Sequence, residues 1–227
     1  MKKLALVASI ATIGFASTAF VAPKSTTENS FEGIVTYSIT TDNEQANASM
    51  QNSSVKVYIK GDKSKSIMDM GMYKVITITD EKKPDDPIIL SEVMGNKYQI
   101  KTDKTKKDKN QDPTIKYMDD TKQVAGYACH KAEVTMSDKT GQSVVATVYY
   151  TQDLPAYPGG SGEFKGLKGF PLEYTMQQQG INITMTATKV DKQSVTEDTF
   201  TVPSGYKLMT TEEMQADLQK NMGAAGN

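Results

Sequence analysis

The sequence contains no tryptophan and no arginine, and it has only one cysteine and one histidine. Every basic side chain is therefore a lysine, and the planar guanidinium fork that reads phosphates and guanine edges is missing. We expect no nucleic-acid partner. The single cysteine, Cys129, has no partner for a disulfide within the chain, so we expect it to be a partly buried structural thiol.

The sequence also lacks the motifs that mark common enzymes. It has no G-x-S-x-G, H-E-x-x-H, P-loop or dinucleotide-binding fingerprint. Its one histidine, His130, is adjacent to Cys129 in a predicted strand, where neighbouring side chains point to opposite faces. The two residues therefore cannot act as a nucleophile and its base. We expect no catalytic residue, no cofactor and no enzymatic activity.

Long apolar runs are absent except near the N-terminus. Lys2 and Lys3 precede an apolar stretch over residues 4–15, which is followed by small residues up to Ala19. This order is typical of a cleavable signal peptide over residues 1–19. The apolar stretch is shorter than the roughly 20 residues that a membrane span requires, so we expect no membrane-spanning segment. The mature chain is predicted to be periplasmic or secreted and to begin with a polar tether over 20–30.

The rest of the chain is dominated by patterns of period two, which indicate half-buried strands. The alternation is clearest in residues 181–190, and a polar stretch over 40–52 interrupts the pattern with one short helical turn. We predict a single antiparallel domain over 31–222 with a short tail at 223–227. The predicted strands are 31–39, 55–60, 64–70, 73–79, 88–93, 97–102, 114–118, 124–136, 142–151, 170–177 and 181–190.

Two segments depart from this simple alternation. Residues 144–150 are apolar on both faces, which predicts a central strand that is covered on both sides. Residues 155–169 are rich in glycine and proline, which predicts a long irregular loop. Long loops in compact domains are often functional, so this loop is a candidate lid.

A helix is expected at the C-terminal end of the chain. Thr210 stands three residues before Glu213, which forms a capping box. An apolar stripe with a spacing of four residues follows and ends at Gly223. We expect this helix to pack its stripe on the sheet, and the stripe consists of Met214, Leu218 and Met222.

Methionine is common in this sequence, and three copies alternate near one predicted strand. Met68, Met70 and Met72 would project from one face of an extended segment. Thioethers are soft ligands that suit Cu(I), so this row is a candidate copper site. Methionine is also a flexible filler of cores and apolar pockets, which is the more common role. We predict no metal site for the chain and keep copper handling as an alternative.

An ordered set of short phrases runs through most of the mature chain. The phrases are FEGIVTY at 31–37, VYIKGDK at 57–63, VAGYACHKA at 124–132, VYYTQDL at 148–154, GFPLE at 169–173 and FTVPSGY at 200–206. Together they resemble the exported bacterial family named domain of unknown function 4412, over residues 31–214. That family is similar to the outer-membrane lipoprotein carrier fold, a half-barrel with an apolar concave face.

The resemblance implies a fold and a kind of ligand. The fold is mainly β, a curved antiparallel sheet in the form of a half-barrel, with the C-terminal helix packed on it. The implied function is that of a periplasmic or secreted carrier that holds a lipid, an acylated molecule or another apolar ligand in the concave sheet. The residues expected to line the site are Met68, Met70, Met72, Leu172, Tyr174, Met176, Ile183 and Met185.

The alternative to a carrier is a structural or interaction domain of the cell envelope. In that case the C-terminal helix would close the sheet completely and leave no cavity for a ligand.

Overall fold

The computed structural model describes residues 31–101, 112–137, 143–158, 164–178 and 180–224. The predicted signal peptide, the tether and most of the tail lie outside these ranges. The described elements are β1 (Glu32–Thr41), α1 (Glu44–Ser49), β2 (Ser54–Lys60), β3 (Lys63–Asp69), β4 (Tyr73–Asp80), β5 (Ile88–Val93), β6 (Asn96–Ile100), β7 (Thr114–Val124), β8 (Tyr127–Ser137), β9 (Ser143–Thr151), β10 (Phe170–Gln178), β11 (Ile181–Lys192), a 3-10 helix η1 (Glu197–Phe200), β12 (Lys207–Met209) and α2 (Thr211–Ala224).

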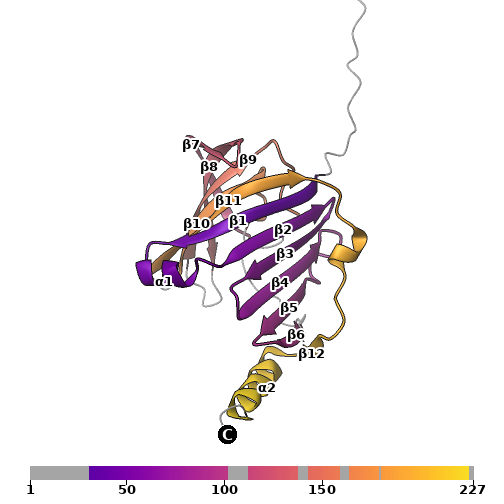
Figure 1. The fold of residues 1–227 in the computed structure, drawn as a ribbon. Coiled ribbons are helices and arrows are strands. Elements are labelled where there is room, and N and C mark those ends of the chain that lie inside the picture. Colours follow the sequence, from indigo (N-terminus) through magenta and orange to yellow (C-terminus); the bar gives the residue numbers. More distant parts are fainter. Residues whose placement is uncertain (1–30, 102–111, 138–142, 159–163, 179, 225–227) are drawn as a thin grey trace, which may run out of the picture.

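All twelve strands belong to one curved sheet (Figure 1). The strands from β1 to β6 form one meander and those from β7 to β11 form a second, because each strand pairs with its neighbour along the chain. Antiparallel pairing of β1 with β11 joins the two meanders, and the short β12 adds to β6 in parallel. The prediction of a mainly β fold with a curved antiparallel sheet and a short C-terminal helix is confirmed.

One face of the sheet is apolar, and we call it the apolar face. Its centre is formed by Val35, Tyr37 and Ile39 of β1, which are at most 8% exposed. Residues that pair across strands share a face, so Val55 and Val57 of β2 lie beside them. The register continues through β11, β10, β9 and β8, where buried alanines and valines alternate with polar side chains. The hydrophobic core therefore lies on this face.

Part of the apolar face is filled by the segment between β9 and β10. Phe164 and Leu167 of this segment are 8% and 4% exposed, and they pack with buried residues of β8 and β9 such as Val134 and Val148. We call these two side chains the plug. The predicted loop over 155–169 thus contributes to the core where it is described. Its large apolar side chains cover apolar residues of β8 and β9 that would otherwise be exposed to water.

The opposite face is covered around β4 and β5 by the segment that follows β11. Val195 and Phe200 pack against Ile76, Ile78 and Leu90. This segment runs down the side of the sheet in Figure 1 and includes η1. The sheet therefore has core on both faces, but over different strands.

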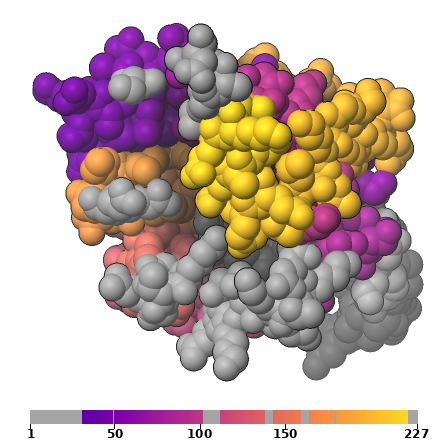
Figure 2. Space-filling view, turned by 90° about the horizontal axis from the view of Figure 1, so that it is seen from below, coloured from indigo at the N-terminus to yellow at the C-terminus, as the bar shows by residue number. Residues whose placement is uncertain are grey.

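The helix α2 begins with the predicted capping box. The backbone N–H of Thr210 donates to Glu213 Oε2 at 2.8 Å, and the N–H of Glu213 donates to Thr210 Oγ1 at 3.2 Å. The hydroxyl of the buried Tyr98 on β6 donates to Asp217 of the helix at 2.8 Å. The helix therefore meets the sheet at the β6 and β12 edge (Figures 1 and 2). It continues to Ala224, one residue beyond the predicted end.

Two of the predicted strands have wrong limits. The strand predicted over 114–118 extends to Val124 as β7. The single strand predicted over 124–136 is instead the end of β7, a two-residue turn and β8. Ala125 and Gly126 have φ of 50° and 83°, as in a type I′ hairpin turn, in which both central residues have positive φ. The turn was missed because an alanine in a left-handed conformation has no sequence signal.

In the described ranges no helix is both long and apolar enough to cross a membrane.

The prediction that residues 144–150 form a strand covered on both sides is also wrong. β9 is the third strand from one edge of the sheet, and Val145 on its outer face is 52% exposed. Tyr149 on the same face is half-buried by neighbouring side chains. The ammonium of Lys122 lies 4.5 Å from its ring centre, and its hydroxyl donates to Asp120 at 2.9 Å. Individual polar side chains thus cover part of the outer face of β9, and no second layer of secondary structure among the described residues packs there.

Candidate ligand-binding surface

Five of the eight residues that were predicted to line a site lie half-buried on the apolar face. Met185 of β11 pairs with Tyr174 of β10, and Ile183 pairs with Met176. Met68 of β3 pairs with the buried Val55. All five pack against the buried clusters without being covered by them. The structure therefore brings residues from three strands to one partly exposed apolar surface.

The predicted lining residue Leu172 occupies a different position. Its side chain is fully buried. The register between β9 and β10 shifts between Pro171 and Glu173, so Leu172 lies at an irregularity in the strand. Leu172 belongs to the buried cluster against which Tyr174 and Met185 pack, so it lies in the core and not on the open surface.

Met70 and Met72 do not lie in a strand. β3 ends at Asp69, whose Oδ1 accepts a hydrogen bond from the N–H of Gly71 at 3.0 Å and starts the turn into β4. Met70 and Met72 are 37% and 77% exposed, whereas Met68 is half-buried. The expectation of three thioethers in a row on one strand is therefore wrong, and the geometry that favoured Cu(I) is lost. No group of three His, Cys, Asp or Glu side chains among the described residues is placed to hold a metal ion.

Tyr174 connects the plug with the open part of the apolar face. Its ring is 5.0 Å from the ring of Phe164 and 6.4 Å from that of Tyr37, in edge-to-face arrangements in both cases. Its hydroxyl donates to the sulfur of Met185 at 2.6 Å. The phenol is thus fixed on three sides. It lies between Phe164 of the plug and Met185.

Two further methionines belong to this surface and were not predicted. Met50 follows α1 and packs on the cluster of β1 and β2, and Met136 of β8 packs on the cluster of β8 and β9. Met136 continues the alternation of Ala132 and Val134, which was a usable signal. Nothing in the local sequence identified Met50. We call the half-buried aliphatic side chains and methionines of this surface the rim: Met50, Met68, Met136, Met176, Ile183 and Met185.

The cysteine and the histidine do not form a reactive pair. Cys129 is fully buried, its thiol donates to the carbonyl of Tyr127 at 3.6 Å, and burial raises the pKa of the thiol to about 11. His130 is exposed, and its ring lies 6.1 Å from that of Tyr150. A protonated thiol in the core is a packing group. Cys129 is buried more completely than the sequence suggested.

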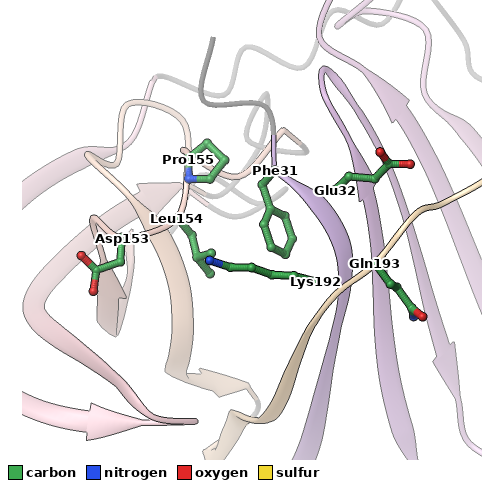
Figure 3. A pocket seen from close by; sticks show the side chains of 7 residues that line it. All are labelled: Phe31, Glu32, Asp153, Leu154, Pro155, Lys192 and Gln193. Carbon is green, nitrogen blue, oxygen red and sulfur yellow. The ribbon is translucent and has the colours of Figure 1, made fainter. Parts of the chain in front are cut away.

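A separate pocket of about 410 Å³ lies at the other end of β1 (Figure 3). Phe31 and Leu154 provide apolar surface, and Lys192 extends across the pocket toward Leu154. The lining is completed by Glu32, Asp153, Pro155 and Gln193. The rim pairs with residues 39–41 of β1, so the two regions are roughly 25 Å apart along that strand. The charged groups make the pocket a poorer match for an acyl chain than the rim.

Two solved structures of PNGF-II, in the C2 and P21 space groups, are similar to this chain with a TM-score of 0.54 each. The identity is 15% and 16%, and the match covers 82% of this chain and 32% of the other chain. This chain therefore spans about one third of the length of PNGF-II. At such low identity the similarity concerns the fold alone.

Lipoprotein structures are also among the structural neighbours. They include the Mycobacterium tuberculosis lipoprotein LppX, with a TM-score of 0.37 and 10% identity over 72% of this chain and 89% of that one. They also include a putative outer membrane lipoprotein-sorting protein domain from Vibrio parahaemolyticus, with a TM-score of 0.35 and 11% identity over 75% and 89%. Scores below 0.5 carry no argument about this chain.

No protein-family model and no curated protein matches the sequence. The resemblance to domain of unknown function 4412 therefore stays a prediction.

Proposed function

We propose that this chain is an exported binding protein that holds an apolar ligand, such as an acyl chain, against the rim. The observation that carries the proposal is the half-burial of the rim beside fully buried neighbours. Val55 and Ala187 are at most 5% exposed, whereas Met68 and Met185 on the same face remain partly open. Single exposed apolar side chains are common on protein surfaces, but a contiguous group of them often marks a binding site.

The chemistry of the rim supports this function. Five of its six members are methionines, whose unbranched side chains adapt to irregular apolar shapes. Covering apolar surface contributes about 25 cal/mol per Å², so a ligand that shields several of these side chains gains useful affinity without a charged contact. The rim is therefore suited to a class of apolar ligands more than to one rigid molecule.

The plug limits where the ligand lies. Phe164 and Leu167 already cover the β8 and β9 part of the face, and Tyr174 separates them from the methionines of β11 and β3. We therefore expect the ligand to lie along β10, β11 and the neighbouring end of β1. The open rim favours a carrier over a purely structural domain. A structural domain has no use for an uncovered apolar surface.

The test measures binding of a dansyl-labelled undecanoic acid to delipidated protein by fluorescence. Replacing Met68 and Met176 together with Gln keeps the length of the side chains but adds an amide that resists burial. We expect the double variant to bind at least about tenfold more weakly. Val145→Gln, on the outer face of β9, is the matched control and should bind as the unchanged protein does.

Native mass spectrometry of protein purified from a bacterial periplasm complements the titration. A stoichiometric lipid adduct that is lost in the Met68→Gln and Met176→Gln double variant would support the proposal. Absence of any adduct, together with no binding of the labelled acid by delipidated protein, would refute it in favour of a structural domain.

A further inference from the structure

Four large apolar side chains stand exposed on two neighbouring turns, and none of them belongs to the rim. Met70, Met72 and Tyr73 lie at the turn between β3 and β4, and they are 37%, 77% and 39% exposed. Met94 lies at the turn between β5 and β6 and is 61% exposed. We call these four residues the methionine tips.

The two turns form one surface. The N–H of Met94 donates to the carbonyl of Met72 at 3.0 Å, which holds the turns side by side. The turn between β3 and β4 is closed by the N–H of Met70, which donates to the carbonyl of Tyr73 at 2.9 Å. The turn between β5 and β6 is closed by the pairing of Val93 with Asn96. The exposed side chains are therefore presented on a fixed frame.

The backbone of Met94 adds a second, independent observation. Its φ is 50° and that of Gly95 is 84°, a conformation that favours Asn, Asp or Gly at the first position. A methionine there is disfavoured by the local backbone and also exposes apolar surface to water. A residue that breaks two local rules at an exposed position points to a use outside folding.

The tips lie at the same end of the sheet as the rim. β1, β3 and β5 run in the same direction, because each is antiparallel to the strand between them. Their C-terminal ends therefore share one edge, where α1 and the two turns are found (Figure 1). Met68 of the rim is only two residues before Met70, so the rim and the tips lie at the same edge of the sheet.

The charged groups near the tips are already paired. Lys74 contacts Asp69 at 3.1 Å and Glu92 at 3.7 Å, and Glu92 also accepts the hydroxyl of Tyr206 at 2.5 Å. These contacts reduce the repulsion that free carboxylates would exert on anionic headgroups. Protruding methionines with a tyrosine beside them suit insertion into a bilayer interface, where amphipathic rings are favoured.

We propose that the methionine tips dock the protein on a lipid bilayer surface, with the rim at the edge of the sheet that faces the bilayer. The inference extends the proposed function, since docking there would place the ligand site next to its membrane source or destination. A bilayer suits exposed apolar side chains that are distributed over two turns, because lipid chains adapt to each side chain separately.

The test is co-sedimentation of the full mature chain with vesicles of phosphatidylethanolamine and phosphatidylglycerol. Met72→Ser combined with Met94→Asn should lower the bound fraction at least about tenfold, and Asn favours the backbone of position 94, so the variant should fold at least as stably. Leu208→Ser, which removes another exposed apolar side chain on β12, should bind vesicles as the unchanged protein does. Binding that persists in high salt would support apolar insertion.

Three results would overturn the inference. These are no vesicle binding by the unchanged protein, equal binding by the double variant, and a loss of self-association in the variant, which would make the tips a contact between copies. The labelled-acid titration separates this failure from that of the proposed function. If the unchanged protein binds the labelled acid but not vesicles, only the docking proposal is refuted. If it binds neither, the proposed carrier function is refuted as well.

Discussion

At the scale of single residues, the burial of Cys129 has a chemical consequence. Desolvation is the main cause of a thiol pKa raised from 9.0 to about 11. At pH 8 the thiolate fraction then falls by about a hundredfold, and the thiolate is the form that reacts. We expect labelling by a disulfide reagent to be at least about a hundredfold slower in the folded protein than in urea.

The comparison needs one protein under two conditions, with absorbance of the released thiol as the readout. Equal labelling rates in buffer and in urea would show that Cys129 is accessible, and would contradict the buried position. The pH dependence should point the same way, because the folded rate keeps rising above pH 9, where the rate in urea levels off.

Residue by residue, the sequence predicted the open part of the site better than its limits. Alternation predicted strands over 170–177 and 181–190, and the structure pairs Tyr174 and Met176 of the first with Met185 and Ile183 of the second. It failed at Met70 because Asp69 ends the strand through a side-chain contact that alternation does not report. Leu172 shares the alternation of Tyr174 and Met176, and alternation does not show that its side chain is fully buried.

At the scale of elements, the segment after β11 is fastened to the sheet by a carboxylate of β1. Glu32 accepts from the N–H of Val195 at 2.6 Å and contacts Lys60 at 3.2 Å. Glu197, further along the same segment, contacts Lys63 at 2.6 Å. The hydrogen bond from Val195 is the main cause that lowers the pKa of Glu32 below 4.5, followed by Lys60. The charged form of Glu32 is therefore favoured in the folded state.

This pKa predicts how stability depends on pH. Since the pKa is lower in the folded than in the unfolded chain, Glu32 contributes stability above pH 4.5 and loses it as the pH falls below that value. We expect Glu32→Gln to lower the melting temperature near neutral pH and to lose less stability between pH 5 and pH 3 than the unchanged protein does. Melting curves across this range measure the difference.

Glu133→Gln is the control for this series. The carboxylate of Glu133 makes an exposed contact with Lys116 at 3.7 Å. The control should keep the pH response of the unchanged protein. A Glu32→Gln variant with that same response would show that the fastening contributes nothing.

Elements were predictable where local chemistry decides them. The capping box of Thr210 and Glu213 located the start of α2. The short β12 had no comparable signal, because three residues gain strand geometry only from their pairing with β6. Contacts between distant segments decide such elements, and a single sequence does not display them.

At the scale of the whole molecule, the pairing of β1 with β11 holds the two meanders together and positions the rim. Met185 and Ile183 pair with residues 39 and 41 of β1, so the rim exists only when this joint is formed. The buried hydroxyl of Tyr37 reinforces it by donating to the carbonyl of Pro171 at 2.8 Å. Alternation predicted both strands but could not show that they are neighbours, because their separation in sequence leaves the partner open.

Gly33 makes the close approach at this joint possible, and its replacement tests the role of the joint. A Cβ at this position would lie 2.3 Å from the backbone oxygen of Asp191, which cannot move without breaking the strand pair. We expect Gly33→Ala to lower the free energy of unfolding by more than about 2 kcal/mol, measured by urea denaturation. Gly205→Ala is the comparison, because its added methyl meets no atom within 4 Å and only the positive φ of 91° opposes it, at roughly 1 kcal/mol. If the Gly33→Ala variant is as stable as the Gly205→Ala variant, the joint tolerates separation and the two meanders are less dependent on each other than the topology indicates. If it is much less stable and also loses binding of the labelled acid, the joint sets both the fold and the ligand surface.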